Sequence, residues 1–246
     1  MNSSTAHRFL LHKWFSLVCL IALFSLIRLP AEDGPIFELK IEKEKISDIS
    51  AAAREINSKV FPFQDEKTGK TFVRLDRPDS ITIPYLKEDP FFKSGPFTWI
   101  LVGNLETYNK GPSPRQLAGR WDATTDGRYA SITFVKEANQ LNLNLSPDGK
   151  QIYQTRMVQN LEIHEETILV AYYSPEVGAS IQMRDKKGTI LCEANIKKSL
   201  PCLSESSAPF SFNGNKDSWS FNLSHFIAWN RALNDTEIIS ILTALK

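Results

Sequence analysis

The chain has 246 residues, of which 42% are hydrophobic and 23% are charged. These proportions are ordinary for a globular protein, and they exclude a disordered chain or a collagen-like fibre. The formal net charge of +1 gives no broad electrostatic attraction for nucleic acid or for an acidic membrane.

The N-terminal segment has the features of a secretory signal. Arg8 and Lys13 precede an apolar run over residues 14–27, and Ala31 stands before the acidic Glu32. This run is shorter than the roughly 20 residues that a membrane-spanning helix needs. We therefore expect cleavage after Ala31, and an uncleaved signal-anchor is the alternative.

Residues 1–31 are thus expected to be a signal peptide or signal-anchor, and residues 32–246 a single domain. Without the first 31 residues the chain has 26 basic and 28 acidic residues, a net charge of −2. The expected location is secreted, periplasmic or at the cell surface, with membrane attachment only if the signal stays uncleaved.

Short β-rich runs separated by turn residues follow, which is the pattern of an all-β sandwich or barrel. Most of them alternate apolar and polar residues, whereas 97–103 and 168–173 are continuously apolar, as expected near the centre of a sheet. Turns are expected at 136–139, 147–150 and 185–188. The runs expected as strands are 71–76, 80–84, 97–103, 129–135, 141–145, 168–173, 179–184 and 189–192.

Two segments depart from the strand pattern. Residues 46–56 form either a helix or an irregular connection, and the sequence leaves both open. Near the C-terminus, Asn234 with Glu237 three residues later is a capping-box pattern that predicts a helix start. The residues that then share one apolar helical face are Ile238, Ile241, Leu242 and Leu245.

The cysteine count predicts one disulfide. Cys19 lies in the signal segment, so the mature chain keeps Cys192 and Cys202. An even pair in an exported chain favours a bond between the two, closing a loop over residues 193–201. Two free thiols are the alternative.

Several segments follow the order and spacing of one family. Residues 72–76 with 80–84 are similar to an early strand pair, and residues 97–101 to the strand that follows it. Residues 230–238, with the sequence NRALNDTEI, are similar to a closing N-R-A-L-(S/T)-x-x-E-I motif. Together they resemble the laminin G-like jellyroll domains of the concanavalin A-like lectin/glucanase superfamily, over roughly residues 37–245.

This resemblance implies two antiparallel sheets packed as a jellyroll sandwich with a short C-terminal helix. It also implies a glycan- or protein-binding module with an adhesion or accessory role. Calcium is possible by the resemblance. The family often has a Gly and an Asp just before the last strand, whereas this chain has Phe221 and Ser224 there, so no calcium site is identifiable.

The residues do not predict catalysis or a bound cofactor. Glycosidases of this fold use paired carboxylates, and an alternating Glu/Asp run that would pair them on one strand is missing. The serine-hydrolase elbow, clustered zinc ligands and a phosphate-binding glycine loop are also missing. His225 is expected to be a packed or edge histidine, and Glu166 part of a solvated charged loop.

The candidate ligand residues lie around one tryptophan. Sugar binding needs an aromatic face and nearby polar groups. Trp121 could stack on a sugar while Asp122 and Arg128 hydrogen-bond to it, with Tyr129 following the polar loop, and Trp219 is a second candidate. The alternative places Trp121 in the core with Asp122 capping a turn, and Trp219 at the entry of a strand.

The sequence therefore predicts an exported, non-catalytic module that binds a carbohydrate or an extracellular protein, and no nucleic acid. A divergent glycoside hydrolase or polysaccharide lyase on the same fold is one alternative, and a structural envelope protein is another.

Overall fold

The structure is a computed structural model that describes residues 34–108, 115–122, 127–135, 140–158, 165–213 and 219–245. Contacts divide the chain into two units, Met1–Gly34 and Pro35–Lys246, and the described residues lie almost entirely in the second. The expected signal segment, its cleavage site at Ala31 and the expected loop at 136–139 lie outside the described residues. None of the helices in the described ranges is both long and apolar enough to cross a membrane.

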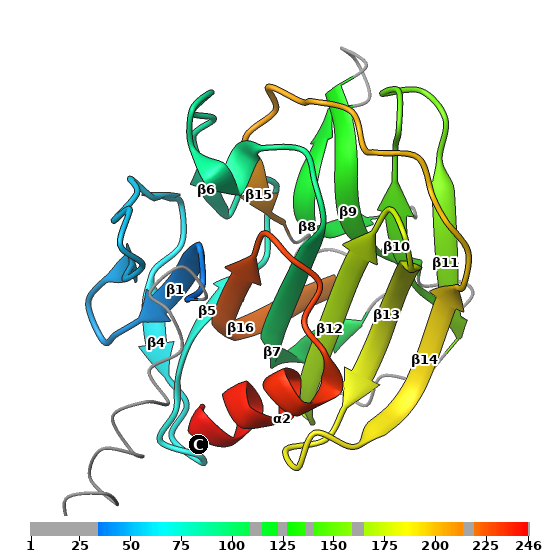
Figure 1. Ribbon diagram of the computed structural model, residues 1–246. Coiled ribbons are helices and arrows are strands. Elements are labelled where there is room, and N and C mark those ends of the chain that lie inside the picture. The colour runs from blue at the N-terminus through cyan, green and yellow to red at the C-terminus, as the bar shows by residue number, and fades with distance from the viewer. Residues whose placement is uncertain are drawn as a thin grey trace, which may run out of the picture. The chain divides into compact units, whose positions relative to one another are not determined.

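The described strands form two antiparallel sheets (Figure 1). The nine-stranded sheet has the order β14-β13-β12-β7-β16-β1-β2, with β5 pairing to β16 and β4 to β5. The seven-stranded sheet has the order β11-β10-β9-β8-β15-β6-β3. Strands far apart in the sequence, such as β7 and β16, lie side by side. The predicted all-β jellyroll sandwich is confirmed.

All the runs expected as strands form strands. Those of the nine-stranded sheet are β1 (Phe37–Ile41), β2 (Ile46–Asp48), β4 (Pro62–Gln64), β5 (Thr71–Leu75), β7 (Phe97–Tyr108), β12 (Glu166–Ser174), β13 (Gly178–Arg184), β14 (Ile190–Ile196) and β16 (Trp219–Trp229). Those of the seven-stranded sheet are β3 (Asn57–Ser58), β6 (Ile81–Ile83), β8 (Arg115–Asp122), β9 (Gly127–Val135), β10 (Gln140–Leu145), β11 (Tyr153–Val158) and β15 (Phe210–Phe212).

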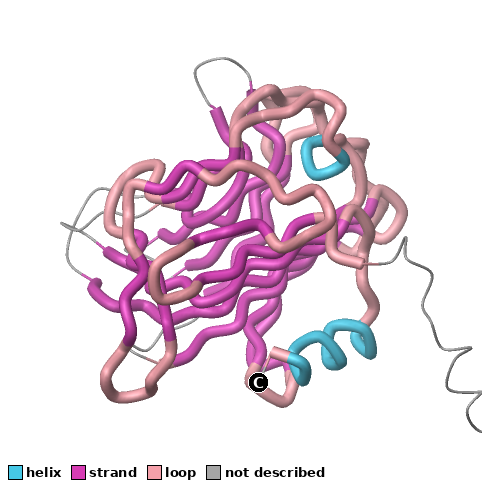
Figure 2. The backbone as a smooth tube through the Cα atoms, turned by 90° about the vertical axis from the view of Figure 1, so that its left-hand side faces the viewer, coloured by secondary structure: helices cyan, strands magenta, loops and turns pink. Residues whose placement is uncertain are grey.

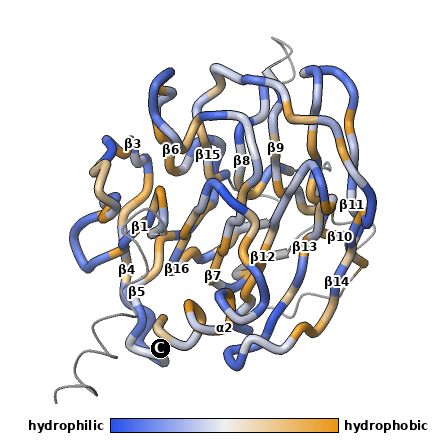
Figure 3. Tube along the Cα trace, in the orientation of Figure 1, coloured by the Kyte–Doolittle hydropathy of each residue, from blue (hydrophilic) through white to orange (hydrophobic). Residues whose placement is uncertain are grey.

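The core lies between the two sheets and is rich in aromatic rings. Phe210 of β15 is fully buried, and its ring centroid lies 5.1 Å from Phe91, 5.1 Å from Trp99 and 5.2 Å from Phe226. Apolar residues alternate with polar ones along many strands in Figure 3. Because of this alternation, each sheet buries one face against the other sheet, and its second face points away from the core.

The C-terminal helix α2 (Asp235–Ala244) packs on the outer face of the nine-stranded sheet, to one side of the strands in Figure 2. Asn234 accepts a hydrogen bond from the backbone N–H of Glu237, whose side chain accepts one from the N–H of Asn234. The predicted capping box is therefore confirmed. Ile238 and Leu242 are buried against the sheet.

Residues 46–56 form no helix. They begin as strand β2 and continue as turns and irregular backbone. Asp48 explains this path, because its carboxylate accepts hydrogen bonds from the backbone N–H groups of Ser50 and Arg54. A side chain that takes up nearby N–H groups competes with helical hydrogen bonds.

The expected disulfide is not formed, and Cys192 and Cys202 are both free thiols. Cys192 lies opposite Met183, whereas Pro201 accepts a hydrogen bond from Tyr173, which pairs with Ala179. Four strand residues separate these two levels, about 13 Å at the usual rise. The Cα atoms of a disulfide lie within about 7 Å of each other. The prediction failed because an extended strand carries the chain away from Cys192.

Candidate functional site

The outer face of the seven-stranded sheet carries a continuous row of uncharged residues, nearly all of them polar. Residues directly opposite one another on antiparallel strands point to the same face, so the pairing register defines the row. It crosses every strand of the sheet through Asn57, Thr82, Ser211, Gly119, Ser131, Asn144 and Gln154. We call these seven residues the polar row.

The adjacent row points the other way and is apolar. It runs through Ile81, Phe212, Ala118, Ile132 and Leu143, all fully buried. Since side chains alternate between faces along each strand, the apolar row faces the core and the polar row faces away from it.

Hydrogen bonds between side chains tie the polar row together over three strands. Arg156 donates through Nε to Gln154 at 2.6 Å, and Gln154 donates through Nε2 to Asn144 Oδ1 at 2.6 Å. Asn144 then donates through Nδ2 to Thr133 Oγ1 at 3.0 Å and to Ser131 Oγ at 3.3 Å. This chain of hydrogen bonds fixes the orientation of the amide groups, so the exposed groups are already held in place before a ligand binds.

The centre of this face is closed and its margins are accessible. Ser131, Asn142 and Asn144 are 5% exposed or less, whereas Gln154 is half-buried and Arg156 is exposed. The central residues therefore support the outer ones, and a ligand would meet the outer ones first.

Gly119 stands in the middle of the polar row for a steric reason. Its φ is +144°, and a Cβ there would lie 2.4 Å from the carbonyl oxygen of Ala130. Beside it, Gln116 lies half-buried and donates through Nε2 to the carbonyl oxygen of Gly119 at 3.0 Å. The glycine thus lets strands β8 and β9 approach closely, and the Gln116 amide is held beside it.

Two of the expected ligand residues, Trp121 and Arg128, lie together at one end of this face. They are direct partners across β8 and β9, and the Arg128 guanidinium lies 5.9 Å from the centroid of the Trp121 ring. Both side chains are half-buried, and Arg128 also donates to the carbonyl oxygen of Gly149 at 3.1 Å. An aromatic ring and a cation are therefore in contact with each other beside the polar row.

Tyr129 does not join them, and this part of the expected site is corrected. A register shift between Arg120 and Trp121 leaves Tyr129 as an additional residue of β9, and its side chain turns into the core, 3% exposed. There its hydroxyl donates to the carbonyl oxygen of Gly95 at 3.2 Å. A β-bulge re-aims side chains in this way, and alternation alone does not predict it.

The remaining candidates lie elsewhere. Asp122 is the next residue after Trp121 on β8, so its side chain leaves the strand on the other side. Trp219 is the first residue of β16, and it pairs with Tyr108 in the nine-stranded sheet. The two tryptophans are therefore on different sheets and do not share one site.

Burial shifts the pKa values of two side chains, Arg120 and Tyr129, that point from β8 and β9 into the core. Arg120 is 1% exposed, and its guanidinium lies 4.7 Å from the centroid of the Tyr129 ring and donates to the carbonyl oxygens of Phe92 and Ser206. Burial lowers the pKa of Arg120 and raises the pKa of Tyr129. Both groups therefore belong to the core and not to the polar face.

The fold also brings two carboxylates together around Arg54. Asp48 and Asp89 both bind Arg54, and their side chains are 0% and 8% exposed. Burial acts to raise the pKa of Asp48, but hydrogen bonds from Ser50 and Arg54 outweigh it and the pKa is lowered. A general acid needs a raised pKa and access to substrate, so this pair is structural.

Within the described ranges, no group of three or more His, Cys, Asp or Glu side chains lies close enough together to hold a metal ion.

No family model matches the chain, and no curated protein sequence matches it either. Solved structures do match. A structure titled "Cell entry of botulinum neurotoxin type C is dependent upon interaction with two ganglioside molecules" has a TM-score of 0.69 at 13% identity, over 89% of this chain and 53% of that one.

Two further matches are similar. The binding domain of Paraclostridial Mosquitocidal Protein 1 has a TM-score of 0.67 at 16% identity, over 87% of this chain and 53% of that chain. The binding domain of botulinum neurotoxin DC, in complex with SialylT, has a TM-score of 0.67 at 13% identity, over 87% and 52% of the two chains. At these identities the likeness shows the fold alone, and this chain spans about half the length of the chains that it matches.

The sequence predicted Trp121 as a ligand residue, but it did not predict the row of neutral side chains. A signal was present in β10, where Asn142 and Asn144 alternate with leucines. Asparagine is uncommon in strands, and two on one face favour hydrogen bonding by that face. The partners on β8, β9 and β11 emerge only once the register is known.

Proposed function

We propose that the chain is an exported, non-catalytic binding module of the laminin G-like type, and that the outer face of its seven-stranded sheet binds a neutral carbohydrate. The observation that carries this proposal is the polar row, whose accessible members Asn57, Thr82 and Gln154 offer hydroxyl and amide groups without charge. Sugar hydroxyls both donate and accept hydrogen bonds, and amide side chains do the same.

The accessible groups have complementary roles in this proposal. Gln154 offers an amide edge, and the hydrogen bond to Asn144 holds that edge in place. Trp121, at the end of the same face, provides a ring for the apolar side of a pyranose. Arg128 is already in contact with Trp121, so it would hold the ring in place as well as bind ligand oxygens.

The structural neighbours support the class of ligand. The titles name ganglioside molecules for botulinum neurotoxin type C and SialylT for neurotoxin DC. Those ligands belong to chains about twice the length of the part that this chain matches, so they support binding of a carbohydrate or protein and do not locate the site. An adhesion or accessory role follows from such binding.

A glycan array probed with the purified protein tests the function, and titration of the best glycan against variants tests the site. Gln154→Ala should weaken binding about fivefold, because a hydrogen bond between partners contributes on the order of 1 kcal/mol. Gln151→Ala is the matched control, since Gln151 is exposed and precedes β11. Equal affinities of the two variants would reject the sheet face, and an array without any binder would reject the carbohydrate.

Export has its own test. The N-terminal sequence of the protein isolated from its native host should begin at Glu32. A protein that keeps Met1 and sediments with membranes would instead support the signal-anchor.

A further inference from the structure

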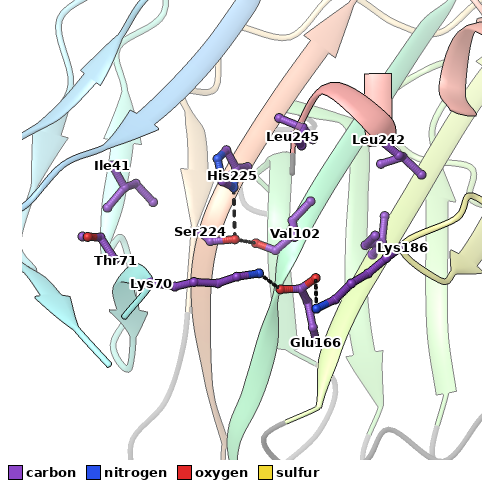
Figure 4. A pocket seen from close by; sticks show the side chains of 11 residues that line it. Ile41, Lys70, Thr71, Val102, Glu166, Lys186, Ser224, His225, Leu242 and Leu245 are labelled. Carbon is purple, nitrogen blue, oxygen red and sulfur yellow. Dashed lines mark hydrogen bonds and ion pairs between the residues drawn. The ribbon is translucent and has the colours of Figure 1, made fainter. Parts of the chain in front are cut away.

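A pocket of about 470 Å³ lies on the opposite side of the domain, on the outer face of the nine-stranded sheet beside the end of α2 (Figure 4). Its volume falls within the range of about 300–1,000 Å³ that is typical of small-molecule sites. The polar row lies on the other sheet, so a ligand in this pocket would be independent of the proposed carbohydrate.

One half of the pocket is aliphatic. Val102 of β7 and Ile168 of β12 line it from the sheet. Leu242 and Leu245 approach from the helix, and Ile41 from the end of β1. The helix covers the neighbouring part of the same apolar sheet surface, where Val102 and Ile168 belong to one cluster with Leu242. The pocket is thus a place where the helix leaves apolar sheet surface open.

The other half is charged and carries one excess positive charge. Glu166 of β12 is bridged by two lysines, Lys70 from the turn before β5 and Lys186 from the turn after β13. The Lys186 ammonium lies 3.3 Å from Glu166 Oε1. Burial acts to raise the pKa of Glu166, but the hydrogen bond and charge of Lys70 and the charge of Lys186 outweigh it, so the pKa is lowered. Two cations therefore share one permanent anion.

His225 adds a neutral hydrogen-bonding group. The hydroxyl of Ser224 donates to the carbonyl oxygen of Val102 at 2.9 Å, and Ser224 Oγ lies 3.2 Å from His225 Nδ1. Since the hydroxyl proton is already donated, Oγ accepts from Nδ1–H, which leaves Nε2 without the proton. Burial, and secondarily the charge of Lys70, lower the pKa of His225, so the ring is neutral at neutral pH.

This arrangement opposes a nucleophilic role for Ser224. A serine nucleophile gives its proton to the histidine, whereas here Ser224 gives it to a backbone carbonyl and is 5% exposed. The contact instead belongs to a β-bulge between Leu223 and His225, which turns His225 toward the pocket. Gly103 permits the bulge, because a Cβ there would lie 2.2 Å from the carbonyl oxygen of Asn222.

We propose that this pocket binds a small amphiphile with a single carboxylate head and an aliphatic chain. The head would lie between Lys70 and Lys186 and balance their charge together with Glu166. The chain would lie against Val102, Ile168 and Leu242. A free carboxylate amphiphile fits a pocket that combines one unbalanced cation with an apolar wall. A neutral lipid would leave the charged half without a partner, and a short polar anion would leave the apolar half without one.

The test is calorimetric titration of the full chain with decanoate, kept below the concentration at which it forms micelles. Decanoate should bind in a saturable way, and acetate and decanol, which each lack one half of the ligand, should bind at least about tenfold more weakly. Equal binding of decanol and decanoate would overturn the anionic head, and equal binding of acetate would overturn the apolar wall.

Two neighbouring lysines provide the matched variants. Lys186→Gln should weaken decanoate binding about fivefold, the scale of an accessible ion pair, while Lys187→Gln should leave it within twofold, because Lys187 does not line the pocket. Decanoate bound elsewhere on the chain would respond equally to both variants, which would overturn the proposal. So would binding to phosphatidylglycerol vesicles without binding of free decanoate, since that result would mean a membrane surface.

Discussion

Arg54 and Asp89 are 35 residues apart in the sequence and form a two-point ion pair in the structure. Nε of Arg54 donates to Asp89 Oδ2 at 2.5 Å, and Nη2 donates to Oδ1 at 2.6 Å. Nη1 of the same guanidinium donates to Asp48 Oδ2 at 2.9 Å. One arginine thus joins the segment after β2 to the loop before β7, with all three side chains nearly buried.

We predict that Arg54→Met destabilises the domain by about 3–5 kcal/mol, because two buried carboxylates lose their counter-ion. Urea unfolding followed by fluorescence measures the change. Arg77→Met is the control: Arg77 also pairs with an aspartate, but its side chain is 54% exposed, and its replacement should cost no more than about 0.5 kcal/mol. Similar losses in the two variants would contradict a structural role for the buried pair.

The C-terminal helix offers a comparison between two adjacent isoleucines. Ile238 is 1% exposed and packs on the sheet, whereas Ile239 is 42% exposed. Ile238→Ala should lower the free energy of unfolding by about 2–5 kcal/mol, through lost burial and the cavity that remains. Ile239→Ala should change it by less than about 0.5 kcal/mol. If thermal melting ranked the two in the reverse order, the packing of α2 on this sheet would be wrong.

The cysteines should be reduced and unequal in reactivity. Cys202 is exposed, while Cys192 is half-buried with its side chain against the core. Alkylation without a reductant should therefore label Cys202 first and Cys192 more slowly, since reactivity follows access of the thiolate. Peptide mapping under non-reducing conditions checks this result. A linked pair of peptides that contains both cysteines would contradict this prediction and show that the disulfide forms.

His225 should make stability depend on pH near neutrality. Its pKa in the folded chain is lowered from the usual 6.5, mainly by burial. The unfolded chain therefore takes up this proton first as the pH falls, so protonation favours unfolding. The stability that the neutral ring contributes is present above the unfolded pKa and is lost as the pH falls through the folded pKa.

The measurement compares wild type with His225→Asn, which does not titrate, from about pH 7.5 to about pH 5. The charges that face the ring, Lys70 and Glu166, are kept in both proteins. Wild type should lose more stability than the variant over this range. Parallel curves would mean that His225 has the same pKa in both states.

Several parts of this protein could be predicted from the sequence because short-range chemistry specifies them. Alternation predicted the strands, and Asn234 with Glu237 predicted the start of α2, because a capping box needs residues only three apart. The turn at Asp148 and Gly149 is equally local, since the Asp148 side chain accepts from the N–H groups of Lys150 and Gln151. The motifs at 80–84 and 230–238 led to the correct fold class.

The sites, in contrast, were decided by register and by bulges. The polar row exists because seven strands align uncharged residues, and the sequence does not state which residues oppose each other. One additional residue in β9 sends Tyr129 into the core, and one in β16 turns His225 toward a pocket. The two lysines that bind Glu166 come from turns 96 and 20 residues away. Local sequence specifies the strands because their hydrogen-bonding and burial preferences are local, whereas a binding site is a set of long-range contacts that only the packed sheets create.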